Sequence, residues 1–268
     1  MRLLWLSLLI PFVKSYPLCL NHRSTGTTST TTANTSAIST VSIIPIVDKT
    51  FNLLFEGNQK FRNGTEYQKE PLSRGYSPKI MFIGCSDNSF SPSTIFQTEI
   101  VASQVNVANQ FSGKDTNANA AVAFAVHNLG VKHIIIMGHY GCKGVHAAMT
   151  LQKSSLDKAV NPWLKPIRDL FFRSKRVEIK NTRDLMRGRN EGAMIVEDDD
   201  TGFRALVEEN VRENVRRLMN ESILSTMYRR KKVEGDEDIK VYVHGFVFNA
   251  ATGEVKDVGV TSEPGFKK

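Results

Sequence analysis

Two cysteines, a histidine and an aspartate have the residue types and the spacing of a metal site. One residue separates Cys85 from Asp87, and His139 and Cys142 form a His-x-x-Cys pair further along the chain. Thiolate sulfur and neutral imidazole nitrogen suit Zn²⁺, and a catalytic zinc commonly has three protein ligands and an open fourth position. Each residue alone is more often structural, but the combination favours a zinc site.

The candidate ligands each follow an apolar segment that is typical of a buried strand. Residues 79–84 precede Cys85, and residues 132–138 precede His139. Apolar runs of this length without alternating polar residues favour strands that are buried on both faces. In open α/β sheets, small molecules and ions bind in the crevice beyond the carboxyl ends of the strands. We therefore expect the candidate ligands to meet at that edge of a sheet.

The elements around these strands predict an α/β protein with a mostly parallel β-sheet flanked by helices. An alanine-rich helix over 117–129, which Gly130 would end, lies between two strand candidates and implies a right-handed crossover. A helix over 203–218 carries an apolar stripe that is typical of core or dimer packing. Residues 174–202 are expected to form an irregular, exposed insertion. The other expected elements are helices over 48–63 and 92–97 and strands over 100–107, 239–248 and 254–260.

The composition is that of a globular protein with one substantial domain. The chain has 268 residues, of which 41% are hydrophobic and 23% are charged, and its net charge is +8. The basic residues are spread along the chain and no recognition motif accompanies them, so we expect no nucleic-acid partner. A positive field would still attract small anions.

The amino terminus has the pattern of a targeting segment. Residues 1–15 are expected to be a signal peptide, because the apolar block from Leu3 to Val13 is too short to span a bilayer. The protein would then be secreted, without stable membrane insertion. Import into mitochondria is the alternative, since no acidic residue precedes Asp48. Residues 16–47 are expected to be a Ser/Thr-rich disordered spacer, and residues 48–262 the folded domain.

The motifs at the two strand ends resemble those of β-class carbonic anhydrases, especially bacterial and fungal ones. Gly84-Cys85-Ser86-Asp87 is similar to the first metal motif of the family, and Gly138-His139-Tyr140-Gly141-Cys142 is similar to the second. Similar segments elsewhere extend the resemblance from about Phe51 to Val260. The resemblance implies zinc held by Cys85, His139 and Cys142, with Asp87 beside the metal. It also implies reversible hydration of CO2 to bicarbonate by a homodimer or higher homo-oligomer.

The chain departs from the family pattern beside Asp87. The family motif continues Ser-Asp-Ser-Arg, and its arginine pairs with the aspartate, whereas this chain has Asn88 and then Ser89. A carboxylate near Zn²⁺ with no competing cation should bind the metal directly. We therefore expect a closed site in which Asp87 is the fourth ligand and CO2 hydration is weak. Lys143 is the alternative cation.

Two other functions stay open at this point. One is a zinc-binding homologue with little or no hydration activity, which the missing arginine favours. The other is a related zinc hydrolase that acts on carbonyl sulfide or carbon disulfide. Metal analysis combined with a CO2 hydration assay would separate them.

Overall fold

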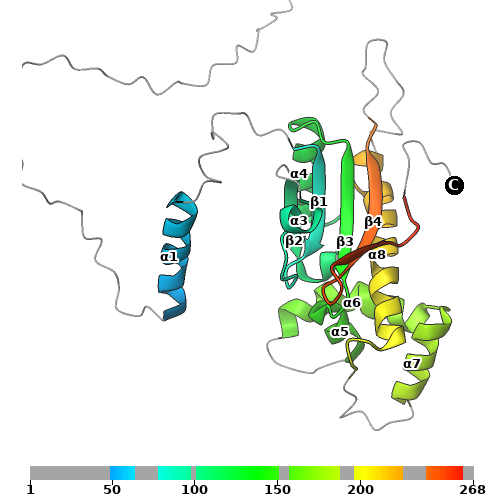
Figure 1. Ribbon diagram of the computed structural model, residues 1–268. Coiled ribbons are helices and arrows are strands. Elements are labelled where there is room, and N and C mark those ends of the chain that lie inside the picture. Colours follow the sequence, from blue (N-terminus) through cyan, green and yellow to red (C-terminus); the bar gives the residue numbers. More distant parts are fainter. Residues whose placement is uncertain are drawn as a thin grey trace, which may run out of the picture. The chain divides into compact units, whose positions relative to one another are not determined.

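The computed structural model describes residues 49–63, 78–97, 101–150, 157–187, 196–225 and 240–261 (Figure 1). The chain divides into two units, residues 1–69 and residues 70–268. The expected signal peptide and spacer, residues 1–47, lie outside the described residues.

A five-stranded sheet forms the centre of the larger unit. Its order is β2-β1-β3-β4-β5. The first four strands are parallel to their neighbours, and β5 pairs antiparallel with β4. The predicted mostly parallel sheet is therefore confirmed. The strands are β1 (Ile80–Cys85), β2 (Val101–Asn106), β3 (His133–His139), β4 (Tyr242–Asn249) and β5 (Glu254–Asp257).

The pairing of β1 with β3 positions the candidate site. These two strands are far apart in the sequence but adjacent in the sheet, with Ile83 opposite Ile136 and Gly84 opposite Met137. Both run in the same direction, so Cys85 and His139 end at the same edge. The crossover between β2 and β3 contains the predicted helix, and Gly130 follows it with a φ of 69°.

Helices flank the sheet, and the longest of them runs beside β3 and β4 (Figure 1). This helix begins after Asp200, whose carboxylate accepts a hydrogen bond from the Phe203 amide. The helical segments that lie wholly within the described residues of the larger unit are α3 (Pro92–Phe96), the short 3₁₀ helix η1 (Val107–Asn109), α4 (Thr116–His127), α5 (Lys143–Thr150), α6 (Asp157–Arg173), α7 (Val177–Arg187) and α8 (Thr201–Glu221).

The apolar stripe of α8 belongs to the core of its own subunit. Phe203, Leu206, Val211 and Leu218 are all fully buried, and α8 packs against β3 and β4. Burial of such large side chains stabilises the fold by about 1.5–3 kcal/mol each. Of the two expectations for this stripe, core packing is therefore confirmed and dimer packing is wrong, because the sheet already covers it.

The expectation of an irregular segment over residues 174–202 is wrong for α7. This helix is polar on most of its surface and buries only a narrow face, in which Ile179 and Thr182 contact the interior. Arg183 stabilises its approach to α6 by donating hydrogen bonds to the carbonyls of Phe171 and Ser174. The charged and polar residues of this helix outnumber its apolar ones, so the segment resembles an exposed loop in the sequence.

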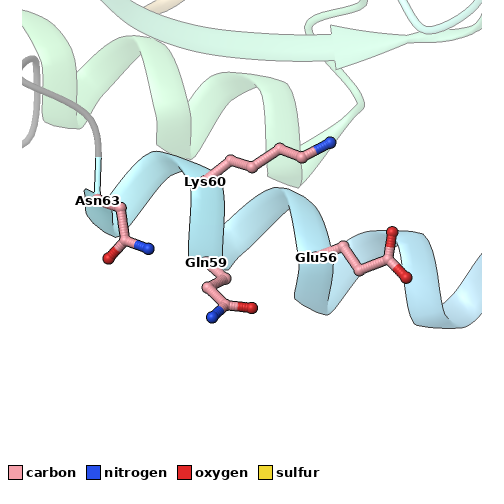
Figure 2. A pocket seen from close by; sticks show the side chains of 4 residues that line it. All are labelled: Glu56, Gln59, Lys60 and Asn63. Atoms are coloured by element: carbon pink, nitrogen blue, oxygen red, sulfur yellow. The ribbon is translucent and has the colours of Figure 1, made fainter.

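The smaller unit contains one described helix, α1 (Lys49–Asn63), which confirms the helix predicted over 48–63. Figure 2 shows four of its side chains, which line a pocket of about 410 Å³: Glu56, Gln59, Lys60 and Asn63. The pocket holds none of the candidate metal ligands.

Candidate metal centre

The four predicted side chains form one cluster beyond the ends of β1 and β3. The ligand atoms of Cys85, Asp87, His139 and Cys142 all lie within 4.8 Å of one another. The two sulfurs are 3.5 Å apart, and Asp87 Oδ1 lies 2.7 Å from His139 Nε2. A tetrahedral zinc with Zn–S bonds of about 2.3 Å holds two sulfurs roughly 3.8 Å apart. The donor set and its spacing therefore fit this ion.

Backbone contacts aim the Asp87 carboxylate into the cluster. Asp87 Oδ2 accepts a hydrogen bond of 2.8 Å from the Lys143 amide at the start of α5, where helix N–H groups lack partners. This leaves Oδ1 directed at Cys85 Sγ, at 2.5 Å, and at the His139 ring. Gly141, with a φ of 76°, provides the tight turn between His139 and Cys142.

A neighbouring carbonyl orients the His139 ring. His139 Nδ1 lies 3.1 Å from the backbone oxygen of Tyr140, which can only accept a hydrogen bond. Nδ1 must therefore carry the proton of this bond, and Nε2 faces the cluster. Metal-binding histidines are commonly fixed in this way.

The electrostatics of the cluster without a metal show that its charges are mutually stabilised. The hydrogen bond with Cys142 lowers the pKa of Cys85 to about 6, although burial opposes this shift. Burial favours neutral His139, but hydrogen bonds to Asp87 and Cys85 raise its pKa to about 9. The hydrogen bond to Cys85, together with burial, raises the pKa of Cys142 well above its usual range. A divalent cation would displace the protons that these groups hold.

The Asp87 carboxylate has no arginine or lysine side chain as an ion-pair partner among the residues that the structure describes. Its ion pair is with His139, within the cluster itself. Lys143 contributes its backbone amide to Asp87, and its side chain is exposed. Ser89 is also exposed. The proposed role of Lys143 as a substitute cation thus finds no support in the described contacts.

A polar network around the buried carboxylate of Glu208 adjoins the cluster and was not predicted from the sequence. The Tyr140 hydroxyl donates to Glu208 Oε1 at 2.8 Å, and the Arg204 guanidinium lies over the Tyr140 ring, 3.6 Å from its centroid. Glu208 also accepts hydrogen bonds of 2.7 Å from Arg176 and from Lys256. Its side chain is 5% exposed, so three donors satisfy a nearly buried carboxylate. No local pattern in the sequence indicates these long-range partners.

Glu208→Gln should destabilise the protein at neutral pH by about 2–3 kcal/mol, because hydrogen bonds to a charged group are lost. Burial tends to raise the pKa of Glu208, but the bonds from Lys256, Arg176 and Tyr140 lower it from 4.5 to about 2. The carboxylate therefore stabilises the fold above pH 4.5, and this contribution disappears as the pH falls towards about 2. In urea unfolding, the difference in the free energy of unfolding between Glu208→Gln and the wild type should shrink as the pH falls from 7 to 3.

Glu209→Gln is the matched control for this prediction. Glu209 is the next residue on α8 and is 23% exposed; it pairs with Arg212 at 2.8 Å and, more distantly, with Arg176 at 3.8 Å. The Glu209→Gln substitution should lower the free energy of unfolding by less than about 1 kcal/mol. Comparison at each pH removes the effect of metal release, which all variants share. A Glu208→Gln variant as stable as Glu209→Gln at pH 7 would contradict the role assigned to the network.

The fold and the cluster together define a mostly parallel α/β protein with a Cys-Asp-His-Cys metal site at the carboxyl edge of its sheet. A family model described as "Carbonic anhydrase" matches residues 80–255. The sequence is 30% identical over 221 residues to a carbonic anhydrase of Emericella nidulans, covering 80% of this chain and 86% of that protein. The chain belongs to the β-class carbonic anhydrase family, which confirms the resemblance seen in the sequence.

Solved structures agree with this assignment. A β-carbonic anhydrase of the fungal pathogen Aspergillus fumigatus is 27% identical, with a TM-score of 0.56, covering 78% of this chain and 90% of that one. One of two tetrameric β-carbonic anhydrases from Sordaria macrospora shares the fold at 24% identity, with a TM-score of 0.61, covering 80% of this chain and 100% of that one. None of the described helices combines the length and the apolar character needed to cross a bilayer.

Proposed function

We propose that the protein binds zinc and catalyses the reversible hydration of CO2 to bicarbonate. The observation that carries this proposal is the convergence of Cys85, Asp87, His139 and Cys142 at one sheet edge, in a chain of the β-class family. Two thiolates and an oriented imidazole are the ligands that zinc prefers. Bound zinc would supply a Lewis acid that lowers the pKa of water from 15.7 towards about 7.

The side chains of the cluster have different roles. Cys85, His139 and Cys142 are buried and would hold the metal, with Tyr140 fixing the tautomer of the imidazole. Asp87 is the most accessible member, with its side chain 25% exposed. Its Oδ1 faces the cluster while the Lys143 amide fixes Oδ2. Asp87 is therefore placed either to ligate zinc or to hold a proton beside it.

We further propose that Asp87 ligates the metal, so that hydration is slow. Two observations support this. Its Oδ1 lies at hydrogen-bonding distance from Cys85 Sγ and His139 Nε2, and no described cation draws the carboxylate away. A binding protein of the same fold with residual activity is consequently the second candidate function. The same cluster also remains compatible with hydrolysis of carbonyl sulfide or carbon disulfide.

Metal analysis and stopped-flow CO2 hydration on the purified protein test the proposed function. We expect about one zinc per chain, and a slow hydration activity that is lost on chelation and restored by Zn²⁺. Zinc at that level without any hydration would favour the binding protein, or the hydrolase if carbonyl sulfide is turned over. Absence of stoichiometric zinc would overturn the proposal.

We propose that the mature protein is exported after removal of residues 1–15, and that a cut nearer Asp48 with mitochondrial import is the alternative. The apolar block from Leu3 to Val13 supports export. Mass spectrometry of the amino terminus of the native protein distinguishes the two: a start between about Ser15 and Leu20 is expected for a signal peptide. A start near Asp48 would contradict export.

We also propose that the chain forms a homodimer or higher homo-oligomer. The tetrameric Sordaria proteins of the same fold support this. Because the α8 stripe is covered by the sheet, other surfaces must form the contacts. Light scattering at micromolar concentration should give a multiple of the chain mass of 30.0 kDa. A sharp monomer mass would exclude the proposal.

A further inference from the structure

Ala108 has a left-handed backbone conformation beside the metal centre, with a φ of 63° and a ψ of 31°. Asn109, the next residue, has a φ of 46°. Left-handed conformations are uncommon for residues other than glycine, and two in succession need surrounding contacts to hold them. In this conformation the Ala108 amide donates a hydrogen bond of 3.1 Å to Cys85 Sγ.

A buried pair of asparagines on α8 holds the other side of the same peptide segment. Asn210 Nδ2 donates to the Ala108 carbonyl at 2.9 Å. Asn214, one helical turn later, donates to Asn210 Oδ1 at 2.9 Å and so fixes the orientation of the Asn210 amide. Asn210 is 2% exposed and Asn214 is fully buried, so solvent does not compete for these bonds.

Packing from α5 closes the remaining side of Ala108. A Cβ atom at Gly144 would lie 3.0 Å from the Ala108 Cβ and 3.3 Å from its nitrogen. The helix that follows Cys142 therefore approaches Ala108 as closely as a glycine permits. Ala108 is fully buried between these contacts.

We propose that Asn210 is a positioning residue of the metal centre, which holds the Ala108 amide against the Cys85 sulfur and thereby sets how strongly that sulfur donates to a bound metal. An N–H group that donates to a thiolate withdraws electron density from it, and such charge-assisted bonds are strong. Outer contacts of this kind tune metal sites. The inference rests on the proposed metal site but adds a residue that does not touch the metal.

Cobalt substitution measures this effect directly, because charge-transfer bands from thiolate to Co²⁺ report the electron donation of the sulfur. Asn210→Leu in the full chain should shift these bands to longer wavelength, because a sulfur without this N–H donor is more electron-rich. Metal affinity should fall by about ten- to a hundred-fold, because the sulfur is no longer held in place. Thr182→Val is the matched control, since it removes an equally buried hydrogen-bonding side chain, which donates to Asp200 at the start of α8, and leaves the contacts of Ala108 in place. The bands of this control should stay at the wild-type wavelength even if it lowers the stability as much as Asn210→Leu does.

Asn210→Asp is the second variant if Asn210→Leu does not fold. It keeps the shape of the side chain and its bond from Asn214, but presents an oxygen to the Ala108 carbonyl, so the same shift is expected. Wild-type bands in folded Asn210 variants, or equal shifts in the Asn210 and Thr182 variants, would overturn the positioning role and leave the metal site intact. A wild-type protein without thiolate-to-cobalt bands would overturn the metal site as well.

Discussion

Replacing Cys142 with alanine is expected to abolish stable zinc binding. Cys142 is fully buried and its sulfur lies 3.5 Å from that of Cys85, so no nearby group or solvent molecule can supply an equivalent thiolate. Zinc content should fall from about one ion per chain to a small fraction of that. The free energy of metal binding is also free energy of folding, so the variant should be less stable by several kcal/mol. Elemental analysis and thermal unfolding measure the two effects.

Two controls separate the metal from the side chain. Wild-type protein stripped by a chelator should be about as unstable as Cys142→Ala, because both lack the metal. Cys19→Ala, which removes the third cysteine of the chain, should keep its zinc and its stability. Unchanged zinc content in Cys142→Ala would contradict the assignment of Cys142 as a zinc ligand.

Ser89→Arg is expected to raise CO2 hydration by about tenfold or more. A guanidinium at this position can form a bidentate pair with the Asp87 carboxylate, which would draw Oδ1 out of the cluster. Ser89 is exposed, so a longer side chain has room. The fourth position on the metal would then be open to solvent. Stopped-flow measurements on zinc-loaded wild type and variant give the ratio directly.

Ser89→Gln is the matched control for the charge, because it is long and polar but cannot pair ionically with Asp87. It should leave the hydration rate near that of the wild type. Asp87→Asn should weaken the fourth ligand without adding a cation. If Ser89→Gln raises hydration as much as Ser89→Arg, the increase does not come from the ion pair with Asp87.

The strands and the metal cluster were predictable because they depend on strong local signals. A parallel strand that is buried on both faces must be apolar throughout, and the runs before Cys85 and His139 have this property. Parallel strands place their carboxyl ends at the same edge of the sheet, so the metal-binding side chains that follow these strands lie close together. The helix α7 was missed because its charged and polar residues outnumber the apolar ones, so the segment resembles an exposed loop.

The contacts that orient the ligands could not be predicted in the same way. Asn210 and Ala108 are 102 residues apart in the sequence, and their bond depends on a left-handed conformation that alanine rarely adopts. The hydrogen bonds that Glu208 accepts from Arg176 and Lys256 likewise join distant elements. An asparagine or a glutamate on an amphipathic helix gives no sign, in the sequence alone, of which backbone or side chain it will reach.

The coordination of zinc near neutral pH tests the central claim most directly. X-ray absorption spectroscopy on the purified, zinc-loaded wild type should show two sulfur ligands, one imidazole nitrogen and one carboxylate oxygen, from Cys85, Cys142, His139 and Asp87. The oxygen contribution should change in Asp87→Asn and in Ser89→Arg. A fourth ligand from solvent, with spectra unchanged in Asp87→Asn and fast CO2 hydration by the wild type, would contradict a site closed by Asp87.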